Sequence, residues 1–389
     1  MNTETINDSK ASPFSRSCLV AYLVLIVYAS WYPFSGWQVN NLAAISDVIK
    51  QWPRYWTIFD VVINIVGYIP LGLLIVFALY PKFQRVRAII FSTVLGTLLS
   101  MSMEGVQYFI PHRVTSILDL ITNASGTLIG AIAGAMLSSA LMEKGRLRLL
   151  RKQWLHQESS RELLVLSLWP LAQIYPQAYL FGLGQMLPIF SSWIEEFFDI
   201  DIDLSAFLLN GVELEAEEFL LSETFITACG CTGAILICLF LLNRHAPKFW
   251  LACLLLLATL ASKALASALL FSPEVAFAWP TPGAKAGLLI SIIMLYGFSF
   301  APAQVQRRLA ILMLFMSLAL SNLIPSNPYF MISMQNEVQG KFLNFYGAAQ
   351  FLSIVWPLVA LWYLFNHALR GPALATLEEL TDETLEKKP

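Results

Sequence analysis

The chain has 389 residues, of which 57% are hydrophobic and only 13% charged, with a formal net charge of −2. An ordinary soluble domain carries about 25% charged residues, so this composition argues against a water-soluble protein. No basic domain is present, which argues against nucleic-acid binding. The five cysteines fall inside apolar runs and no Cys/His set has metal-ligand spacing, so we expect no disulfide framework, no metal site and no cofactor.

Ten apolar runs are long enough to cross about 30 Å of hydrocarbon. Each is expected to be a helix, because backbone N–H and C=O groups inside lipid have no water to bond. The sequence therefore predicts an all-α, polytopic integral membrane helical bundle with about ten transmembrane helices. The predicted spans are residues 18–37, 60–80, 88–110, 117–142, 163–188, 224–243, 249–271, 284–304, 309–325 and 347–367.

The positive charge between these runs predicts their orientation, because cytoplasmic segments retain Lys and Arg. With the N-terminus inside, the inner segments hold eighteen Lys and Arg residues, and the outer segments hold only Lys50, Arg54, Arg113 and Lys341. We therefore expect both termini to lie in the cytoplasm.

A basic connection divides the chain into a group of four spans and a group of six. The outer loop 191–223 of the second group has ten acidic residues and no basic one, and we expect it to be solvated, with some amphipathic helix. The predicted organisation is an N-terminal tail at 1–17, a four-helix membrane domain at 18–142, the basic connection at 143–162, a six-helix extension at 163–367 and a C-terminal tail at 368–389.

Polar side chains inside the first group of spans lie at one depth. Ionisable residues within a span are costly and point to a functional site. Asp60 and Asn64, near the outer end of the second span, are four residues apart and share a helix face. Glu104 and Gln107 are three apart, within about 10 Å of the outer end of the third span.

The next connection carries Arg113, and the fourth span opens with Asp119 and Asn123, again four residues apart. Three spans thus each present a carboxylate and an amide toward the outer surface, with Arg113 in the turn above them. Two interpretations stay open: a ligand site, or a polar knot that holds the helices together.

Two further features concern packing and charge. Gly126, Gly130 and Gly134 form a stripe of small residues along the fourth span, which predicts close approach of another helix. Lys263 lies within the span 249–271, where a charge is expensive unless it is paired or reaches water.

The segments DVVINIVGYIPLG at 60–72 and SMEGVQYFIPHRVTSILDLITNASGTLIGA at 102–131 resemble the VanZ-like family, and YASWYPF at 28–34 matches more loosely. The resemblance covers about 18–142, and segments 327–330 and 339–347 resemble the C-terminal extension of longer VanZ-like proteins. By this resemblance, the family's characteristic positions are Asn64, Pro70, Gly72, Glu104, Gln107, Arg113, Ser116, Asp119, Asn123 and Gly126.

The family takes its name from an accessory protein of glycopeptide-antibiotic resistance, so the resemblance implies a role at the cell envelope, in the bacterial plasma (inner) membrane. No reaction is established for the family generally. One hypothesis is a pocket that binds an envelope lipid or a lipid-linked glycan intermediate, in cell-envelope biogenesis or antibiotic tolerance. Its expected ligand-binding residues are Asp60, Asn64, Glu104, Gln107, Arg113, Ser116, Asp119 and Asn123.

Two alternatives use some of the same residues. In an enzyme, Glu104 or Asp119 would act as general acid or base in transfer or hydrolysis of a lipid-linked group. In a transporter, which we rank last, Lys263 and the carboxylates would relay protons. Membrane lipids and a lipid-linked envelope precursor are the expected partners, and the sequence does not indicate an oligomeric state.

Overall fold

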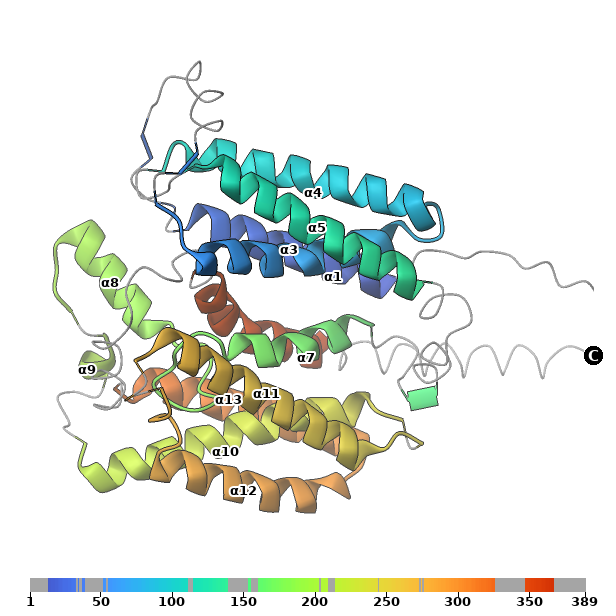
Figure 1. The fold of residues 1–389 in the computed structure, drawn as a ribbon. Coiled ribbons are helices and arrows are strands. Elements are labelled where there is room, and N and C mark those ends of the chain that lie inside the picture. Colours follow the sequence, from blue (N-terminus) through green and yellow to red (C-terminus); the bar gives the residue numbers. More distant parts are fainter. Residues whose placement is uncertain are drawn as a thin grey trace, which may run out of the picture. The chain divides into compact units, whose positions relative to one another are not determined.

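The described part of the chain is helical, which confirms the predicted fold class (Figure 1). The structure is a computed structural model, and it describes residues 13–32, 34, 37–38, 52–53, 55–110, 115–138, 153–154, 160–202, 204–208, 214–243, 245–272, 274, 276–325 and 347–366. The helices are α1 (Pro13–Trp31), α3 (Ile58–Leu79), α4 (Arg85–Gln107), α5 (Ile117–Ser138), α7 (Ser160–Ala172), α8 (Leu187–Phe198), α9 (Leu204–Leu208), α10 (Ala216–Leu241), α11 (Lys248–Leu270), α12 (Pro282–Ser299), α13 (Ala303–Leu323) and a last helix, Gly347–Asn366.

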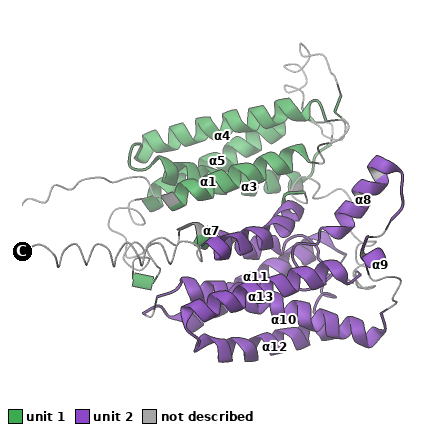
Figure 2. Ribbon diagram, turned by 180° about the vertical axis from the view of Figure 1, so that it is seen from behind, with its two compact units in different colours: residues 1–164, 340–348 green, residues 165–339, 349–389 purple. Residues whose placement is uncertain are grey.

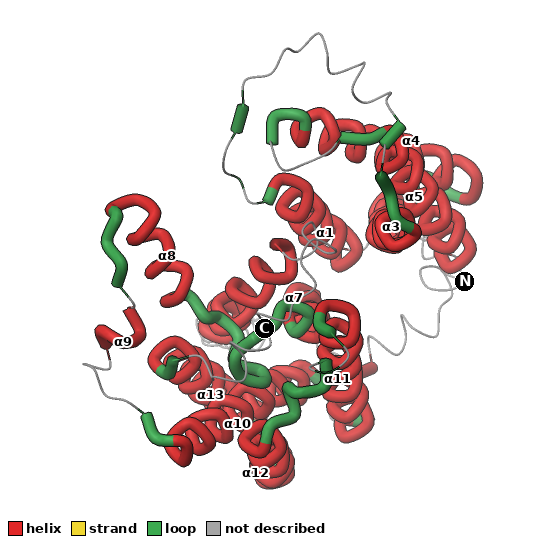
Figure 3. Tube along the Cα trace, turned by 60° about the vertical axis from the view of Figure 1, so that its left-hand side comes forward, coloured by secondary structure: helices red, strands yellow, loops and turns green. Residues whose placement is uncertain are grey.

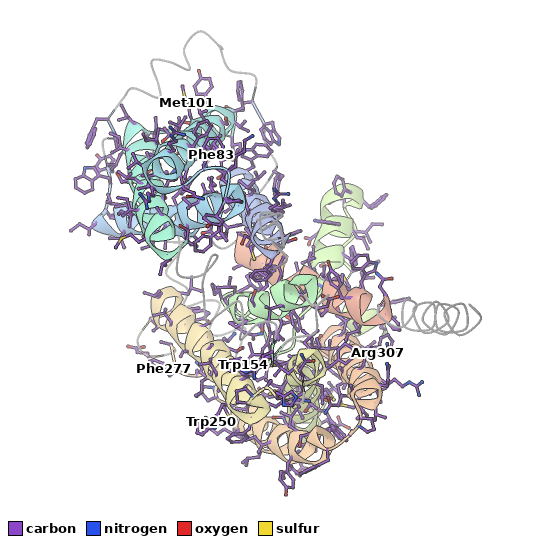
Figure 4. All side chains as sticks on the ribbon, turned by 90° about the vertical axis from the view of Figure 1, so that its right-hand side faces the viewer. Phe83, Met101, Trp154, Trp250, Phe277 and Arg307 are labelled. Carbon is purple, nitrogen blue, oxygen red and sulfur yellow. The ribbon has the colours of Figure 1, made fainter. Side chains whose placement is uncertain are left out.

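Nine of the described helices are long and apolar enough to cross a membrane: α1, α3, α4, α5, α10, α11, α12, α13 and the last helix. Large apolar side chains cover the outward faces of these helices. Met101 on α4 and Trp250 on α11 are examples, and both are exposed (Figure 4). A surface of this kind is stable in lipid, so the chain is a multi-pass membrane protein. The orientation with both termini in the cytoplasm stays a prediction.

The chain divides into two compact units (Figure 2). Unit 1 comprises residues 1–164 and 340–348, and unit 2 comprises residues 165–339 and 349–389. The domain boundary that we predict within 143–162 stays a prediction, because most of that connection lies outside the described residues.

In unit 1, α3 packs most extensively on α5, with α4 and α1 beside them. The stripe of Gly126, Gly130 and Gly134 on α5 lies against the backbone of α3. A Cβ at Gly130 would collide with the carbonyl of Ile69, and one at Gly134 would lie 3.2 Å from Leu73 Cα. Glycine is therefore what lets the two backbones approach each other this closely.

Pro70 lies inside α3 and removes one hydrogen bond of the helix. Side chains of the neighbouring helices bond α3 carbonyls on either side of it. The Tyr22 hydroxyl donates to the Gly67 carbonyl at 2.6 Å, and the Ser92 hydroxyl donates to the Gly72 carbonyl at 2.9 Å. These bonds hold α1 and α4 against the interrupted part of α3.

Unit 2 is built around α10, whose residues are almost all buried from Ile226 onward. α12 and α13 pack on it most extensively, and α11 packs on it less closely. Gly233 accommodates Leu314 of α13, while Gly287 of α12 lies against Thr227 of α10. An apolar helix can be buried all round in this way when other helices, rather than lipid, surround it.

The prediction of a continuous helix over 163–188 is wrong. α7 ends at Ala172, and the chain from Gln173 to Met186 is non-helical (Figure 3). α8 lies at the end of unit 2 where α10 begins, so α7 and this irregular segment together cross the unit (Figures 1 and 2). Irregular backbone is tolerated at such depth only when protein surrounds it, and the stretch from Pro176 to Gly184 is buried.

The predicted outer loop 191–223 contains the end of α8 and all of α9. α8 is amphipathic, and its aromatic side chains Trp193, Phe197 and Phe198 are exposed. This pattern is typical of a helix that lies in the membrane interface.

Candidate functional site

The polar residues expected at the outer end of unit 1 come from three helix ends that lie together. These are the starts of α3 and α5 and the end of α4. The residues fall into an inner layer, which is buried, and an outer layer, which is half-buried. The inner layer consists of Glu104, Gln107 and Asn123, and the outer layer consists of Asp60, Asn64 and Asp119.

Glu104 is only 3% exposed and holds the start of α5. Its Oε2 accepts a hydrogen bond from the backbone N–H of Ser116 at 3.1 Å, and its backbone carbonyl accepts one from the Thr115 hydroxyl at 3.2 Å. A carboxylate at the N-terminus of a helix is favoured by the helix dipole. Glu104 therefore fixes the end of the connection that carries Arg113.

Gln107 is 7% exposed and ties α4 to α1. Its amide Nε2 donates to the backbone carbonyl of Ser30 at 3.0 Å. The backbone N–H of Gln38 donates to the Phe109 carbonyl at 2.9 Å just beyond these helices. This end of unit 1 is thus closed by bonds between α1 and α4.

Asn123 connects α5 to α4 through Ser100. Its Nδ2 donates to the Ser100 hydroxyl at 3.0 Å, and the Tyr68 hydroxyl of α3 is also hydrogen-bonded to Ser100. The Oδ1 atom of Asn123 is buried without a hydrogen-bond partner among the described residues. Ser100 and Tyr68 are not among the predicted site residues, because serine and tyrosine are ordinary residues in an apolar helix and carry no charge to mark them.

The outer layer is joined by a hydrogen bond between α3 and α5. Asn64 Nδ2 donates to Asp119 Oδ1 at 2.8 Å, and the Asp119 backbone N–H donates to the Ser116 hydroxyl at 3.2 Å. Asp60 lies close enough to Asp119 for the two carboxylates to repel each other. Neither carboxylate has an ion-pair partner within the part of the chain that is described.

Asp60 also caps its own helix. Its Oδ2 accepts from the backbone N–H of Thr57 at 2.9 Å and from the Thr57 hydroxyl at 2.7 Å, while the Asp60 N–H donates to that hydroxyl at 3.2 Å. This reciprocal arrangement is a capping box. The spacing Thr-x-x-Asp before an apolar run was the available signal for it.

Arg113, together with residues 111, 112 and 114, lies outside the described residues. Its proposed position above the polar side chains therefore stays a prediction.

Aromatic side chains are exposed around the same helix ends. Trp37 follows α1, while Trp52, Tyr55 and Trp56 precede α3. Trp and Tyr are enriched at the boundary between lipid and water, so this distribution is the one expected for helix ends near a membrane surface. Among the described residues, no group of three His, Cys, Asp or Glu side chains could hold a metal ion.

The region that carries these polar residues matches a known protein family. A family model described as VanZ/LLP1 matches residues 19–138, which contain most of α1 and all of α3, α4 and α5. No curated protein and no solved structure matches the chain. Residues 19–138 are therefore similar to the VanZ/LLP1 family, and the chain continues beyond them with further membrane helices.

Proposed function

We propose that the outer end of unit 1 binds the polar headgroup of an envelope lipid or of a lipid-linked glycan intermediate, in the plasma membrane of a bacterium. The observation that carries this proposal is the pair of neighbouring carboxylates of Asp60 and Asp119 at half-buried positions, of which Asp119 is bonded to Asn64. Two neighbouring acids without a described cationic partner are costly at the edge of a membrane, which favours a role in binding.

The chemistry of these groups indicates the kind of ligand. A carboxylate accepts hydrogen bonds from hydroxyl and amine groups, and it has about four lone-pair sites. Asn64 and the Ser116 hydroxyl both bond the Asp119 carboxylate. The remaining acceptor capacity suits the hydroxyl groups of a sugar or the amine of a phospholipid headgroup.

Arg113 would supply the complementary charge for a phosphate. A guanidinium group binds phosphate through two parallel hydrogen bonds. Arg113 is only two residues before Thr115, and Glu104 holds Thr115 and Ser116 in place. In this proposal, the phosphate of a headgroup would bind the Arg113 guanidinium. Its hydroxyl or amine groups would donate to the carboxylates of Asp60 and Asp119.

The inner layer has a different role in this proposal. The side-chain amides of Gln107 and Asn123 donate hydrogen bonds to neighbouring helices. The Glu104 carboxylate accepts a hydrogen bond from the start of α5. Hydrogen bonds of this kind hold membrane helices in register. We infer that the inner layer keeps the three helix ends in place, while the outer layer contacts the headgroup.

The test is native mass spectrometry of the full-length protein with its co-purified lipids. Asp119→Asn keeps an acceptor for Asn64 but removes the charge, so we expect about tenfold weaker retention of headgroup-bearing lipid. Arg113→Ala should selectively remove phosphate-bearing lipids. The controls are Arg87→Ala and Glu217→Gln, because both residues are exposed charges at other helix starts. Equal lipid retention in all five proteins would refute the proposal.

A further inference from the structure

The directions of the helices bring several helix termini of unit 2 to one end. α13 runs opposite to α10, because two contacts between them occur in reversed order. The Ser317 hydroxyl donates to the Ile226 carbonyl at 3.2 Å, while Leu314, earlier on α13, lies against Gly233, further along α10. The start of α13 therefore lies at the end of unit 2 where α10 ends.

α12 runs in the same direction as α10. Gly283, near its start, lies against Glu223, and Gly287, one turn later, lies against Thr227. The end of α12 thus lies where α10 ends, and α11 starts there too, after the short connection 242–247. We call these four termini, the ends of α10 and α12 and the starts of α11 and α13, the basic end of unit 2.

Cationic side chains gather at the basic end without acidic neighbours in the sequence. Lys248 begins α11, and Arg307 and Arg308 lie in the second turn of α13. Residues 224–336 contain one acidic residue, Glu274, which follows the opposite end of α11. None of the three cationic side chains has a hydrogen bond or an ion pair to a residue that the structure describes. Positive charge therefore accumulates at the basic end.

The two arginines differ in exposure. Their guanidinium groups lie close enough to repel each other. Arg307 is buried, whereas Arg308 is exposed. A ligand can therefore reach the guanidinium of Arg308, while Arg307 adds positive charge behind it.

The side chain of Gln306 fixes the start of α13 against the end of α12. It is only 2% exposed, and its Nε2 donates to the backbone carbonyls of Phe298 and Ser299 at 3.2 Å each. The last carbonyls of a helix lack the regular partner four residues further on, so these bonds satisfy groups that would otherwise need water. The arginines that follow Gln306 are therefore held in place beside α12 rather than on a loose terminus.

Exposed aromatic side chains indicate the depth of the basic end in the membrane. Phe249 and Trp250 follow Lys248 on α11, and Tyr296 and Phe300 lie at the end of α12. All four aromatic side chains are between 70% and 75% exposed. Trp and Tyr are enriched at the level of the lipid headgroups. The cationic side chains beside them are therefore expected at the level of the lipid phosphates.

We propose that the basic end of unit 2 binds the headgroup of an anionic phospholipid, in the leaflet that the sequence predicts to be cytoplasmic. The Arg308 guanidinium would bind the phosphate through two parallel hydrogen bonds. Arg307 and Lys248 would add to the attraction of negative charge. A zwitterionic headgroup suits this end less well, because its amine would find cations and no carboxylate of these helices. A site in unit 2 is independent of the headgroup site proposed for unit 1.

The experiment measures lipid binding to the purified full chain by native mass spectrometry in a non-ionic detergent. Phosphatidylglycerol is the anionic probe, and phosphatidylcholine is the zwitterionic one. Arg308→Gln should weaken the binding of phosphatidylglycerol about fivefold, and Arg308→Gln combined with Lys248→Gln about 25-fold, because each cation contributes a similar attraction. Phosphatidylcholine binding should stay the same. Equal phosphatidylglycerol binding by the wild type and the double variant would overturn the proposal.

Two controls separate a site from general attraction between charges. Lys285→Gln and Arg87→Gln each remove one exposed positive charge elsewhere, from the first turn of α12 and from the first turn of α4 in unit 1. Both should leave phosphatidylglycerol binding unchanged, and a loss equal to that of Arg308→Gln would overturn the site.

A competition arm separates a lipid from a free phosphate compound. Soluble glycerol phosphate carries the same phosphate group as phosphatidylglycerol but no acyl chains. At equal concentration it should fail to displace phosphatidylglycerol, because it lacks the apolar part that stays in the membrane or the micelle. Displacement at equal concentration would overturn the assignment of a lipid ligand.

Discussion

Replacing Gly126 by alanine is expected to separate α3 from α5 beside the outer layer of the candidate site. A Cβ at this position would lie 3.0 Å from the carbonyl carbon and the Cα of Ile65, and closer still to its carbonyl oxygen. Ordinary contact between carbon atoms is about 3.5–4.0 Å, so the helices would have to move apart by about 1 Å.

That displacement is large enough to break a functional contact. The hydrogen bond from Asn64 to Asp119 is 2.8 Å long and joins the same pair of helices, from the residue next to Ile65 on α3 to the residue seven positions before Gly126 on α5. Lengthened to about 3.8 Å, it would no longer be a hydrogen bond. Overpacking costs about 1–3 kcal/mol and the lost interhelical bond about 0.6 kcal/mol, which together give about 2–4 kcal/mol.

Thermal unfolding followed by far-ultraviolet circular dichroism measures the result, and a drop of about 5 °C or more is expected. Gly67→Ala is the matched control, because a Cβ at Gly67 would have no atom within 4 Å. It should be unchanged or slightly more stable, since alanine favours the helix. Equal melting temperatures for the two variants would refute the packing argument.

Two further predictions concern buried charged residues. Glu104→Ala should lower stability by about 1–3 kcal/mol in thermal unfolding, because it leaves the backbone N–H of Ser116 unpaired, whereas Glu104→Gln keeps an acceptor and should cost less. If both variants lose the same stability, the charge of Glu104 matters more than its hydrogen bond. Lys263 is 4% exposed and has no hydrogen bond or ion pair to the residues that the structure describes, so Lys263→Met should raise the melting temperature. A lower melting temperature would mean that its ammonium group has a polar partner.

Hydropathy predicted most of the membrane helices, because a span needs about 20 apolar residues and few other segments have them. It failed at 163–188, where average hydropathy says nothing about the path of the backbone. The signals for the interruption were local: Pro176 cannot donate a hydrogen bond, and Gly184 has a φ of 83° that other residues rarely adopt. Gln173 and Gln177, which are costly inside an apolar run, marked the same place.

For the candidate site, the spacing of polar residues predicted which side chains share a helix face but not which ones bond. The four-residue spacing placed Asn64 on the same helix face as Asp60. The described hydrogen-bond partner of Asn64 is nevertheless Asp119, on another helix. Gln107 likewise bonds the backbone of Ser30, seventy-seven residues away. Such pairs depend on the register between helices, and that register is set by contacts such as those of Gly126, which the spacing of polar residues does not report.

A ligand can use only the hydrogen-bonding capacity that helix packing leaves over. Glu104 binds the N-terminus of α5, and Gln107 and Asn123 donate to their neighbours, so substitutions there should act first on stability. Asp119 accepts one hydrogen bond from Asn64 and is half-buried near the predicted membrane surface, so its substitution should act first on lipid retention. The two kinds of measurement therefore separate the two layers: if Glu104→Gln changed lipid retention as much as Asp119→Asn while leaving stability intact, the inner layer would have to be counted as part of the binding surface.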